Sequence, residues 1–160
     1  MGFVVKILVM GLPGAGKTEL STQLAIVLKA VHFNADAVRA NLNKDLGFSI
    51  EDRIEQARRM GFLCDTVHAA GYIVIADFVC PTEETRNAFG DAYIIWVNRI
   101  DSGRFSDTNL LFQPPTNSNI MIPPGLSIDQ EISMIIDDLQ LNNWINTHTK
   151  EEKTTWIPSK

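Results

Sequence analysis

The sequence predicts an α/β fold, in which a parallel β-sheet carries helices on both faces in a three-layer α/β/α arrangement. The main observation is an alternation of short apolar runs, rich in β-branched residues, with longer segments of helical period. Such alternation is typical of parallel sheets built from β–α–β units. A second observation is the glycine-rich stretch GLPGAGKT, which stands between the first apolar run and the first helical segment. That context makes a phosphate-binding loop credible.

The first part of the chain is expected to contain two strands and three helices. Residues 3–10 predict a strand because FVVKILV is apolar and rich in β-branched residues, and a helix is expected at residues 16–30. A short strand follows at residues 31–34, and then a brief helix at residues 37–42. The longest predicted helix covers residues 50–70, where apolar residues recur at three- and four-residue steps. Its apolar stripe consists of Ile50, Ile54, Ala57, Gly61, Cys64 and Val67.

The rest of the chain is expected to contain three strands, two helices and one irregular segment. The strands are expected at residues 72–76, 92–97 and 119–122. The first two of these are near-continuous apolar runs, which are typical of strands buried on both faces. Residues 81–89 predict a short helix, whereas residues 98–117 have no clear period. The last helix is expected at residues 127–145, where Ser127 and Gln130 have the spacing of a capping box.

Length and composition fit a single domain over residues 1–160, with residues 147–160 as a polar tail. The apolar fraction is 45% and the net charge is −5. This acidic balance argues against a nucleic-acid partner, because proteins that grip a phosphate backbone carry a basic surface. The spacing of Cys64 and Cys80 suggests neither a metal site nor a disulfide, so a reducing, cytoplasmic location is expected. No apolar run is long enough to span a membrane.

The glycine-rich stretch matches the pattern G-x-x-x-x-G-K-[ST] without a mismatch, through Gly11, Gly16, Lys17 and Thr18. Its glycines let backbone N–H groups wrap a phosphate chain, and the helix that follows adds positive potential. Lys17 can reach the β- and γ-phosphates, and Thr18 can place its hydroxyl on Mg²⁺. A chance glycine-rich turn is the alternative. The stretch therefore predicts a P-loop NTPase fold that binds ATP through Gly11, Leu12, Pro13, Gly14, Ala15, Gly16, Lys17 and Thr18.

Functional residues are expected directly after strands, because ligands of such folds bind at the carboxyl ends of the strands. Asp36 and Arg39 follow the second strand and lie one helical turn apart. The carboxylate can accept a proton from an attacking hydroxyl, and the arginine can bind an anion. The alternative is a helix N-cap aspartate beside a surface arginine.

Asp77 follows a buried strand and is well placed to hold Mg²⁺ or its water. A simple turn residue is the alternative. Cys80 is interpreted as a small buried filler rather than a nucleophile.

Phe48 and Phe105 lie in predicted loops, where stacking on a flat base would use an exposed ring. Core packing is the alternative. Arg53 and Gln56 lie three residues apart on the predicted helix, opposite its apolar stripe, where a solvated face is the alternative. Arg58 and Arg59 are interpreted as part of such a solvated face. The three histidines are interpreted as structural or surface residues: His32, His68 and His148.

Residues 34–81 resemble the adenylylsulfate kinase family, whose members phosphorylate the 3′-hydroxyl of adenosine 5′-phosphosulfate (APS). The matching pieces are NADAVRANLNKDLGFS, EDRIEQARRMG and YIVIADFVCP. NKDLGFS followed by EDR is more specific to that family than the phosphate loop is. FSDTNLLFQPP at residues 105–115 is similar to a family segment that ends in two prolines.

The resemblance implies roles for several residues. Asp36 matches an aspartate that works near Mg²⁺ and the accepting hydroxyl. With Lys17 of the phosphate loop and Asp77 after the buried strand, it completes the predicted catalytic residues: Lys17, Asp36 and Asp77. Thr18, Asp36 and Asp77 are the predicted metal-site residues. The predicted substrate contacts are an arginine pair for the phosphosulfate, two aromatic rings and an apolar side chain around the adenine, and three further polar residues. They are Arg39, Arg53, Phe48, Phe105, Val79, Asp36, Gln56 and Arg104.

The chain also departs from the family pattern. Asn34 replaces an aspartate, Gln56 replaces an asparagine and Cys80 replaces a serine, while Asp77 stands where the family has a small or hydroxylated residue. The family's long lysine-rich lid is reduced here to a short stretch within residues 98–117. Arg99 or Arg104 is therefore expected to supply the missing cation near the transferred phosphoryl group, and residues 98–117 are the expected moving part.

The leading hypothesis is ATP-dependent phosphorylation of APS or a similar small nucleotide. Transfer to another metabolite or to a polynucleotide 5′-hydroxyl is the second hypothesis, and the charge argues against the polymer. A nucleotide-binding module or ATPase that transfers nothing is the third. The resemblance also implies a homodimer.

Overall fold

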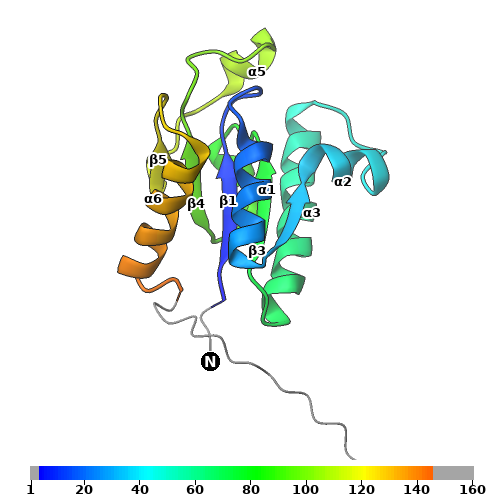
Figure 1. Cartoon of the computed structure of the whole chain (residues 1–160). Helices are drawn as coiled ribbons and strands as arrows, with labels where there is room; N and C mark the ends of the chain where they lie inside the picture. The colour runs from blue at the N-terminus through cyan, green and yellow to red at the C-terminus, as the bar shows by residue number, and fades with distance from the viewer. Residues whose placement is uncertain (1–3, 146–160) are drawn as a thin grey trace, which may run out of the picture.

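The computed structural model describes residues 4–145, which form one five-stranded sheet with helices packed against it (Figure 1). The strands are β1 (Lys6–Met10), β2 (Val31–Asn34), β3 (Val74–Phe78), β4 (Tyr93–Val97) and β5 (Ile120–Ile122). The helices are α1 (Lys17–Leu28), α2 (Ala35–Asn41), α3 (Ile50–Ala69), α4 (Glu83–Phe89), α5 (Ser106–Leu111) and α6 (Ile128–Leu141).

All strand pairs in the sheet are parallel, in the order β2-β3-β1-β4-β5. The register places Asp77 at the end of β3 between Val9 of β1 and Asn34 of β2. The carboxyl ends of these three strands therefore meet at one edge of the sheet. The predicted α/β class with a parallel sheet is confirmed.

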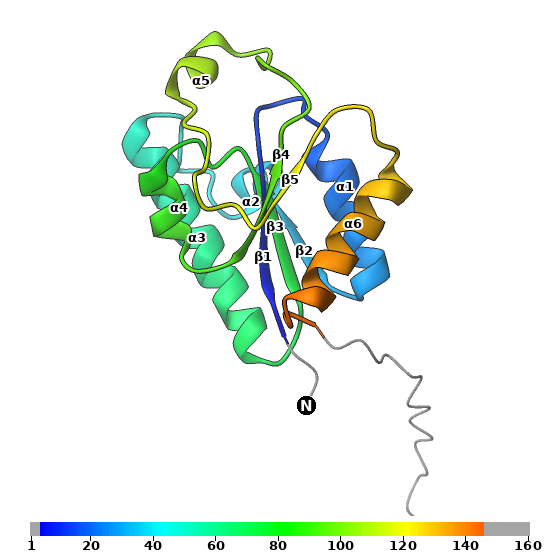
Figure 2. The ribbon, with the colours of Figure 1, turned by 90° about the vertical axis from the view of Figure 1, so that its left-hand side faces the viewer.

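Two apolar clusters make this a three-layer fold. On one face, Leu20 and Leu24 of α1 and Ile135 and Leu139 of α6 pack against the sheet. On the other face the sheet is covered by α2, α3 and α4, which contribute Val38, Met60 and Phe89 among others. Figure 2 shows the sheet edge-on between these two layers, with α5 beyond the carboxyl ends of the strands. The prediction of helices on both faces is confirmed.

Most predicted elements are present, with shifted boundaries. The strand predicted at residues 72–76 begins at Val74 and extends to Phe78, and Tyr72 is exposed. Ile50 was expected in the apolar stripe of α3 but is exposed, because the first turn of that helix extends beyond the core. The helix predicted at residues 127–145 ends at Leu141.

Two local features explain the ends of α6. Ser127 and Gln130 form the predicted capping box at its start. At its end, Asn143 adopts a left-handed backbone conformation (φ 58°), and the N–H of Trp144 turns back to donate to the carbonyl of Leu139 at 2.8 Å. The chain therefore cannot continue as a helix at this point.

Residues 98–117, predicted to be irregular, contain the short helix α5. Its sequence SDTNLL lacks an apolar stripe, and Leu110 is 90% exposed while Thr108 is buried. The predicted polar tail at residues 147–160 lies outside the described residues, as does His148. Within residues 4–145, no helix combines the length and the apolar character needed to cross a membrane.

Candidate functional site

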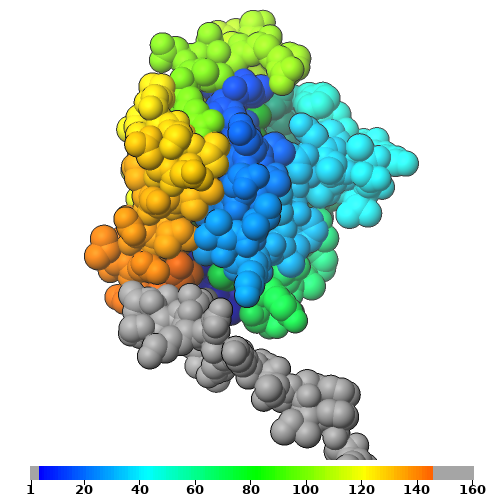
Figure 3. Space-filling view, in the orientation of Figure 1, coloured from blue at the N-terminus to red at the C-terminus, as the bar shows by residue number. Residues whose placement is uncertain are grey.

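A cleft of about 560 Å³ lies at the carboxyl ends of the strands. It is bounded by the loop between β1 and α1, the ends of β2 and β3, the start of α3 and the segment that carries α5. Figure 3 shows the α5 segment (yellow-green) above the blue phosphate loop. The loop after α2 (cyan) projects at the right of this view. The structure brings nearly all of the predicted site residues to this cleft: all of them line it except Gly11, Leu12 and Ala15.

The glycines of the phosphate loop are required by close contacts and by backbone conformation. Gly16 has φ 90°, a left-handed conformation, and a Cβ there would overlap the guanidinium of Arg99. A Cβ at Gly11 would lie 2.5 Å from the carbonyl oxygen of Val97. The loop is therefore packed against the segment that follows β4, and larger residues at either glycine would displace it.

Lys17 is largely buried and its ammonium group donates to the carbonyl of Leu12 at 2.9 Å. Burial lowers the pKa of Lys17 to about 8, because desolvation disfavours its charged form. The nearby carboxylates of Asp77 and Asp36 oppose this effect, while the charge of Arg104 adds to it. A cation that has lost most of its water is a strong partner for an incoming anion.

Asp36 lies in the exposed first turn of α2. The N-cap of this helix is Asn34, whose side-chain oxygen accepts from the N–H of Ala37 at 3.0 Å. The alternative that Asp36 is an N-cap residue is therefore wrong. Its carboxylate lines the cleft, where it can act as a proton acceptor.

Phe48 is held between two arginines at the rim of the cleft. The guanidinium carbons of Arg39 and Arg53 lie 4.5 Å and 5.6 Å from the centre of its ring. Arg53 also donates to the carbonyl of Phe48 at 3.0 Å and to the hydroxyl of Thr108 at 3.3 Å. Phe48 is 65% exposed and Phe105 is 53% exposed, so core packing is wrong for both rings.

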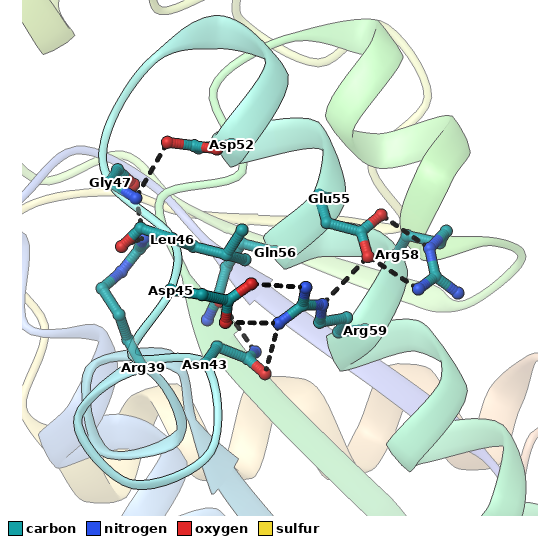
Figure 4. A network of polar contacts seen from close by, with 10 residues as sticks. All are labelled: Arg39, Asn43, Asp45, Leu46, Gly47, Asp52, Glu55, Gln56, Arg58 and Arg59. Carbon is teal, nitrogen blue, oxygen red and sulfur yellow. Dashed lines mark hydrogen bonds and ion pairs between the residues drawn. The ribbon is translucent and has the colours of Figure 1, made fainter.

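A polar network fixes the loop between α2 and α3 that carries Phe48 (Figure 4). The guanidinium of Arg59 donates two hydrogen bonds of 2.8 Å to Asp45, and the carboxylate of Asp52 accepts from the N–H of Gly47 at 2.8 Å. Arg39 donates to the carbonyl of Gly47 at 2.5 Å. Arg59 is 29% exposed and its partner Asp45 is 60% exposed, so the predicted solvated face holds in part for Arg59.

Arg58, the neighbour of Arg59, is exposed and pairs with Glu55 on the same helix at 2.7 Å. For Arg58 the predicted solvated face is confirmed.

Gln56 is almost fully buried, so the alternative of a solvated face is wrong for this residue. The loop after α2 covers this side of α3. The side chain of Gln56 donates to the carbonyl of Ala35 at 3.2 Å and accepts from the amide of Asn43 at 2.9 Å. These bonds tie α2, the loop after it and α3 together beneath the cleft.

The two arginines that could replace the missing lid cations lie in different places. Arg99 points beneath the phosphate loop, donates to the carbonyl of Ala15 at 3.2 Å and pairs with the fully buried carboxylate of Glu131. Arg104 lines the cleft, with its guanidinium carbon 5.7 Å from the ring centre of Phe105. Only Arg104 of this pair faces the cleft.

The loop after β3 contributes Val79 and Cys80 to the cleft wall. Cys80 and Cys64 are both buried and free. Burial raises the pKa of each thiol to about 12, so neither is a ready nucleophile. The interpretation of Cys80 as a buried filler is confirmed.

His32 is a site residue that the sequence interpretation missed. Its Nε2 contacts the carboxylate of Asp77, and the hydroxyl of Thr18 donates to the same carboxylate at 3.0 Å. The available indication was spacing, since His32 and Asn34 stand two residues apart and share one face of β2. Within residues 4–145, no cluster of three or more His, Cys, Asp or Glu side chains could hold a metal by itself.

Curated proteins that this chain resembles in sequence include adenylyl-sulfate kinases. The family model for adenylylsulphate kinase matches residues 2–94, more than half of the chain. The adenylyl-sulfate kinase of Gloeothece citriformis is 39% identical over 103 residues, which are 59% of this chain and 58% of that protein. That of a Picosynechococcus species is 44% identical over 97 residues, 55% of each chain. The chain thus spans a little over half the length of these relatives.

Solved structures support the fold over a longer part of the chain. An APS kinase of Mycobacterium tuberculosis, solved in complex with AMPPNP and APS, has a TM-score of 0.76 at 22% identity, over 87% of this chain and 99% of that one. Shikimate kinase of Aquifex aeolicus has a TM-score of 0.62 at 13% identity, over 86% and 98% of the two chains. The predicted P-loop kinase fold is confirmed by these likenesses. The family match over residues 2–94 shows that this chain belongs to the adenylylsulfate kinase family.

Proposed function

We propose that this protein is an ATP-dependent kinase that phosphorylates the 3′-hydroxyl of APS to give 3′-phosphoadenosine 5′-phosphosulfate. The observation that carries the proposal is the single cleft that brings a phosphate loop, an arginine pair and an aromatic pair together. Family membership supports it, as do the relatives named adenylyl-sulfate kinase. A related structure was also solved with AMPPNP and APS.

ATP is proposed to bind with its phosphates in the loop of residues 11–18. The backbone N–H groups of this loop and the ammonium group of Lys17 would hold the phosphates. The residues present also fit Mg²⁺, because the hydroxyl of Thr18 and the carboxylate of Asp77 are hard oxygen donors at the same edge of the cleft. When bound, Mg²⁺ supplies neutralisation of the phosphate charge. These roles explain why a cation and a carboxylate are buried together here.

The acceptor is proposed to bind at the opposite side of the cleft. Phe48 and Phe105 present exposed rings on which adenine can stack, and Val79 adds an apolar contact. Arg39 and Arg53 would pair with the phosphosulfate. Burial lowers the pKa of Arg39 below its usual range, yet the group stays charged at neutral pH.

Transfer itself would depend on positioning and charge. Asp36 would orient the 3′-hydroxyl and accept its proton as the new O–P bond forms. Lys17 would stabilise the charge on the transferred phosphoryl group. Arg104 is the cleft-facing residue of the short segment after β4, so we assign to it the cation that the family's longer lid supplies.

A second candidate function keeps ATP as the donor and changes the small-molecule acceptor. It is favoured by Gln56, which replaces the family's asparagine at a position of substrate contact and already donates to Ala35 and accepts from Asn43. A polynucleotide acceptor fits less well because the net charge is −5. The homodimer and the cytoplasmic location stay predictions.

The test is ADP release from Mg²⁺-ATP with APS and with a panel of other acceptors: adenosine 5′-monophosphate, shikimate and a 5′-hydroxyl oligonucleotide. The proposal expects APS to stimulate release far more than any of the others. A larger stimulation by another acceptor would favour the second candidate function, a kinase that acts on a different small molecule. ADP release that no acceptor changes would leave the chain as an ATPase.

A further inference from the structure

Four polar side chains form a hydrogen-bonded set beneath the phosphate loop: His32 and Asn34 of β2, Asp77 of β3 and Thr18 of α1. The amide nitrogen of Asn34 donates to the hydroxyl of Thr18 at 3.1 Å and to Oδ1 of Asp77 at 3.0 Å. Thr18 donates to the same Oδ1 at 3.0 Å, and His32 Nε2 contacts Oδ2. Asp77 is only 2% exposed, so its carboxylate depends on these partners rather than on water.

The orientation of the Asn34 amide follows from its role at the start of α2. Its oxygen accepts from the N–H of Ala37 at 3.0 Å, so its nitrogen must face Thr18 and Asp77. An amide nitrogen can only donate. Thr18 therefore accepts from Asn34 and must give its own proton to Asp77.

This arrangement fixes the direction of the Thr18 hydroxyl. A hydroxyl has one proton and two lone pairs. The proton goes to Asp77 and one lone pair accepts from Asn34. No hydrogen bond within residues 4–145 uses the second lone pair, and Thr18 lines the cleft. The threonine is thus prepared to offer a lone pair to a cation.

His32 completes the set at the other carboxylate oxygen. Oδ1 of Asp77 accepts from two donors, and His32 holds Oδ2. Without His32, Oδ2 would lose its partner in a place that water barely reaches, and the carboxylate would be held through Oδ1 alone. Burying an anion without full hydrogen bonding is costly.

The neutral amide at position 34 suits the carboxylate at position 77, because it donates a hydrogen bond and adds no second negative charge. Because the two side chains lie 3.0 Å apart, carboxylates at both positions would repel each other strongly. A single negative charge, shared between two neighbouring strand ends, satisfies every donor in the set.

We propose that His32 and Asn34 are positioning residues that hold Asp77 as the one carboxylate beside the phosphate-loop threonine, and so set how strongly Mg²⁺ enhances nucleotide binding. The inference rests on the proposed binding of Mg²⁺-ATP in this cleft. It assigns a role to a histidine that touches neither the nucleotide loop nor the acceptor side. Residues arranged around metal-site ligands typically alter metal affinity or activity by about 10- to 100-fold when changed.

The test measures the Kd for ATP by calorimetry, once in Mg²⁺ and once in EDTA. The Kd in EDTA divided by the Kd in Mg²⁺ gives the Mg²⁺ ratio, which states how strongly Mg²⁺ enhances ATP binding. His32→Ala is expected to reduce this ratio about 10-fold, and His32→Gln, whose amide can donate from a similar place, is expected to keep most of it. His68→Ala is the matched control, because His68 contacts the carbonyl of Val4 at the opposite end of the sheet. An unchanged ratio in His32→Ala, or equal loss of affinity with and without Mg²⁺, would overturn the inference.

A charge exchange gives a second, independent test. Asp77→Asn is expected to reduce the Mg²⁺ ratio, because it removes the only carboxylate of the set. The double variant Asn34→Asp/Asp77→Asn restores one carboxylate and one amide at the same contact, so it is expected to recover most of the ratio. A double variant as weak as Asp77→Asn would count against the proposal.

Failure of this inference can be told apart from failure of the proposed function. The ratio reports ATP binding alone and is measured on one protein preparation, so a partly folded sample raises both Kd values alike and leaves their ratio unchanged. APS phosphorylation by a His32→Ala protein with an unaltered ratio would refute only the positioning role. Loss of the ratio in His32→Ala, in a chain that does not phosphorylate APS, would refute only the proposed acceptor.

Discussion

Replacement of Lys17 by Met is expected to stabilise the ligand-free protein while it abolishes ATP binding. The ammonium group is buried, and its pKa falls from 10.5 to about 8. That difference means that the buried charge of Lys17 lowers the unfolding free energy by about 3 kcal/mol at neutral pH. Methionine has a similar shape and no charge, so it avoids this cost.

The net gain is smaller because one hydrogen bond is lost. Lys17 donates to the carbonyl of Leu12 at 2.9 Å, and such a bond contributes about 1 kcal/mol. The expected gain at pH 7 is therefore about 2 kcal/mol. For a chain of this length it corresponds to a rise in Tm of about 4–8 °C.

The pH dependence identifies the cause. Below pH 8 the lysine is protonated in both the folded and the unfolded chain, and its full cost is present. Between pH 8 and 10.5 the folded protein releases the proton first, so the unfolding free energy of the wild type rises with pH. The advantage of Lys17→Met should therefore shrink across this window and reverse near its upper end, where only the lost hydrogen bond of about 1 kcal/mol remains.

Thermal unfolding followed by circular dichroism, at pH 7 and at intervals to pH 10.5, measures this difference. ATP at 100 times its Kd should stabilise the wild type by about 2.7 kcal/mol and leave Lys17→Met unchanged. A variant that melts at or below the wild-type temperature at pH 7 would refute the reasoning. So would a gain that does not change with pH.

Three further predictions concern the acceptor side and the support of the phosphate loop. Asp36→Asn should keep its Kd for ATP and lose at least about 100-fold in kcat for APS, and an undiminished kcat would exclude the assigned role. Phe48→Ala should raise KM for APS about 10-fold with little change in KM for ATP, since stacking on one base contributes about 1–3 kcal/mol; equal changes in both would argue against stacking. Arg99→Ala leaves the carboxylate of Glu131 buried without its partner, so it should lower the unfolding free energy by about 3 kcal/mol. Glu131→Gln added to it should restore part of the loss in urea unfolding, and no restoration would contradict the pairing argument.

The sheet was predictable because its strands are apolar runs that the chain repeats at regular intervals. β4 and the middle of β3 are buried on both faces, which is why they read as continuous apolar stretches. The phosphate loop was predictable because its glycine spacing is a local property. α5 was not, because a helix of six mostly polar residues carries no periodic pattern.

The site was predictable only where residues act through local spacing. Asp36 and Arg39 share a helical face, as expected from their separation. By contrast, His32 contacts Asp77 across 45 residues and Arg99 contacts Glu131 across 32. Local spacing places His32 beside Asn34 on one strand face, but it does not identify a partner so far away in the chain. The burial of Gln56 was not predictable because periodicity describes one helix alone, whereas the loop after α2 covers that side of α3.

The most direct test of the account is the identity of the phosphorylated product. The protein would be incubated with Mg²⁺-ATP and APS, and the products examined by mass spectrometry and ³¹P NMR. The account predicts APS that has gained one phosphoryl group on its 3′-oxygen, formed in equal amount with ADP. Unchanged APS, with ADP and free inorganic phosphate, would contradict it and show that this cleft hydrolyses ATP without transferring its phosphoryl group.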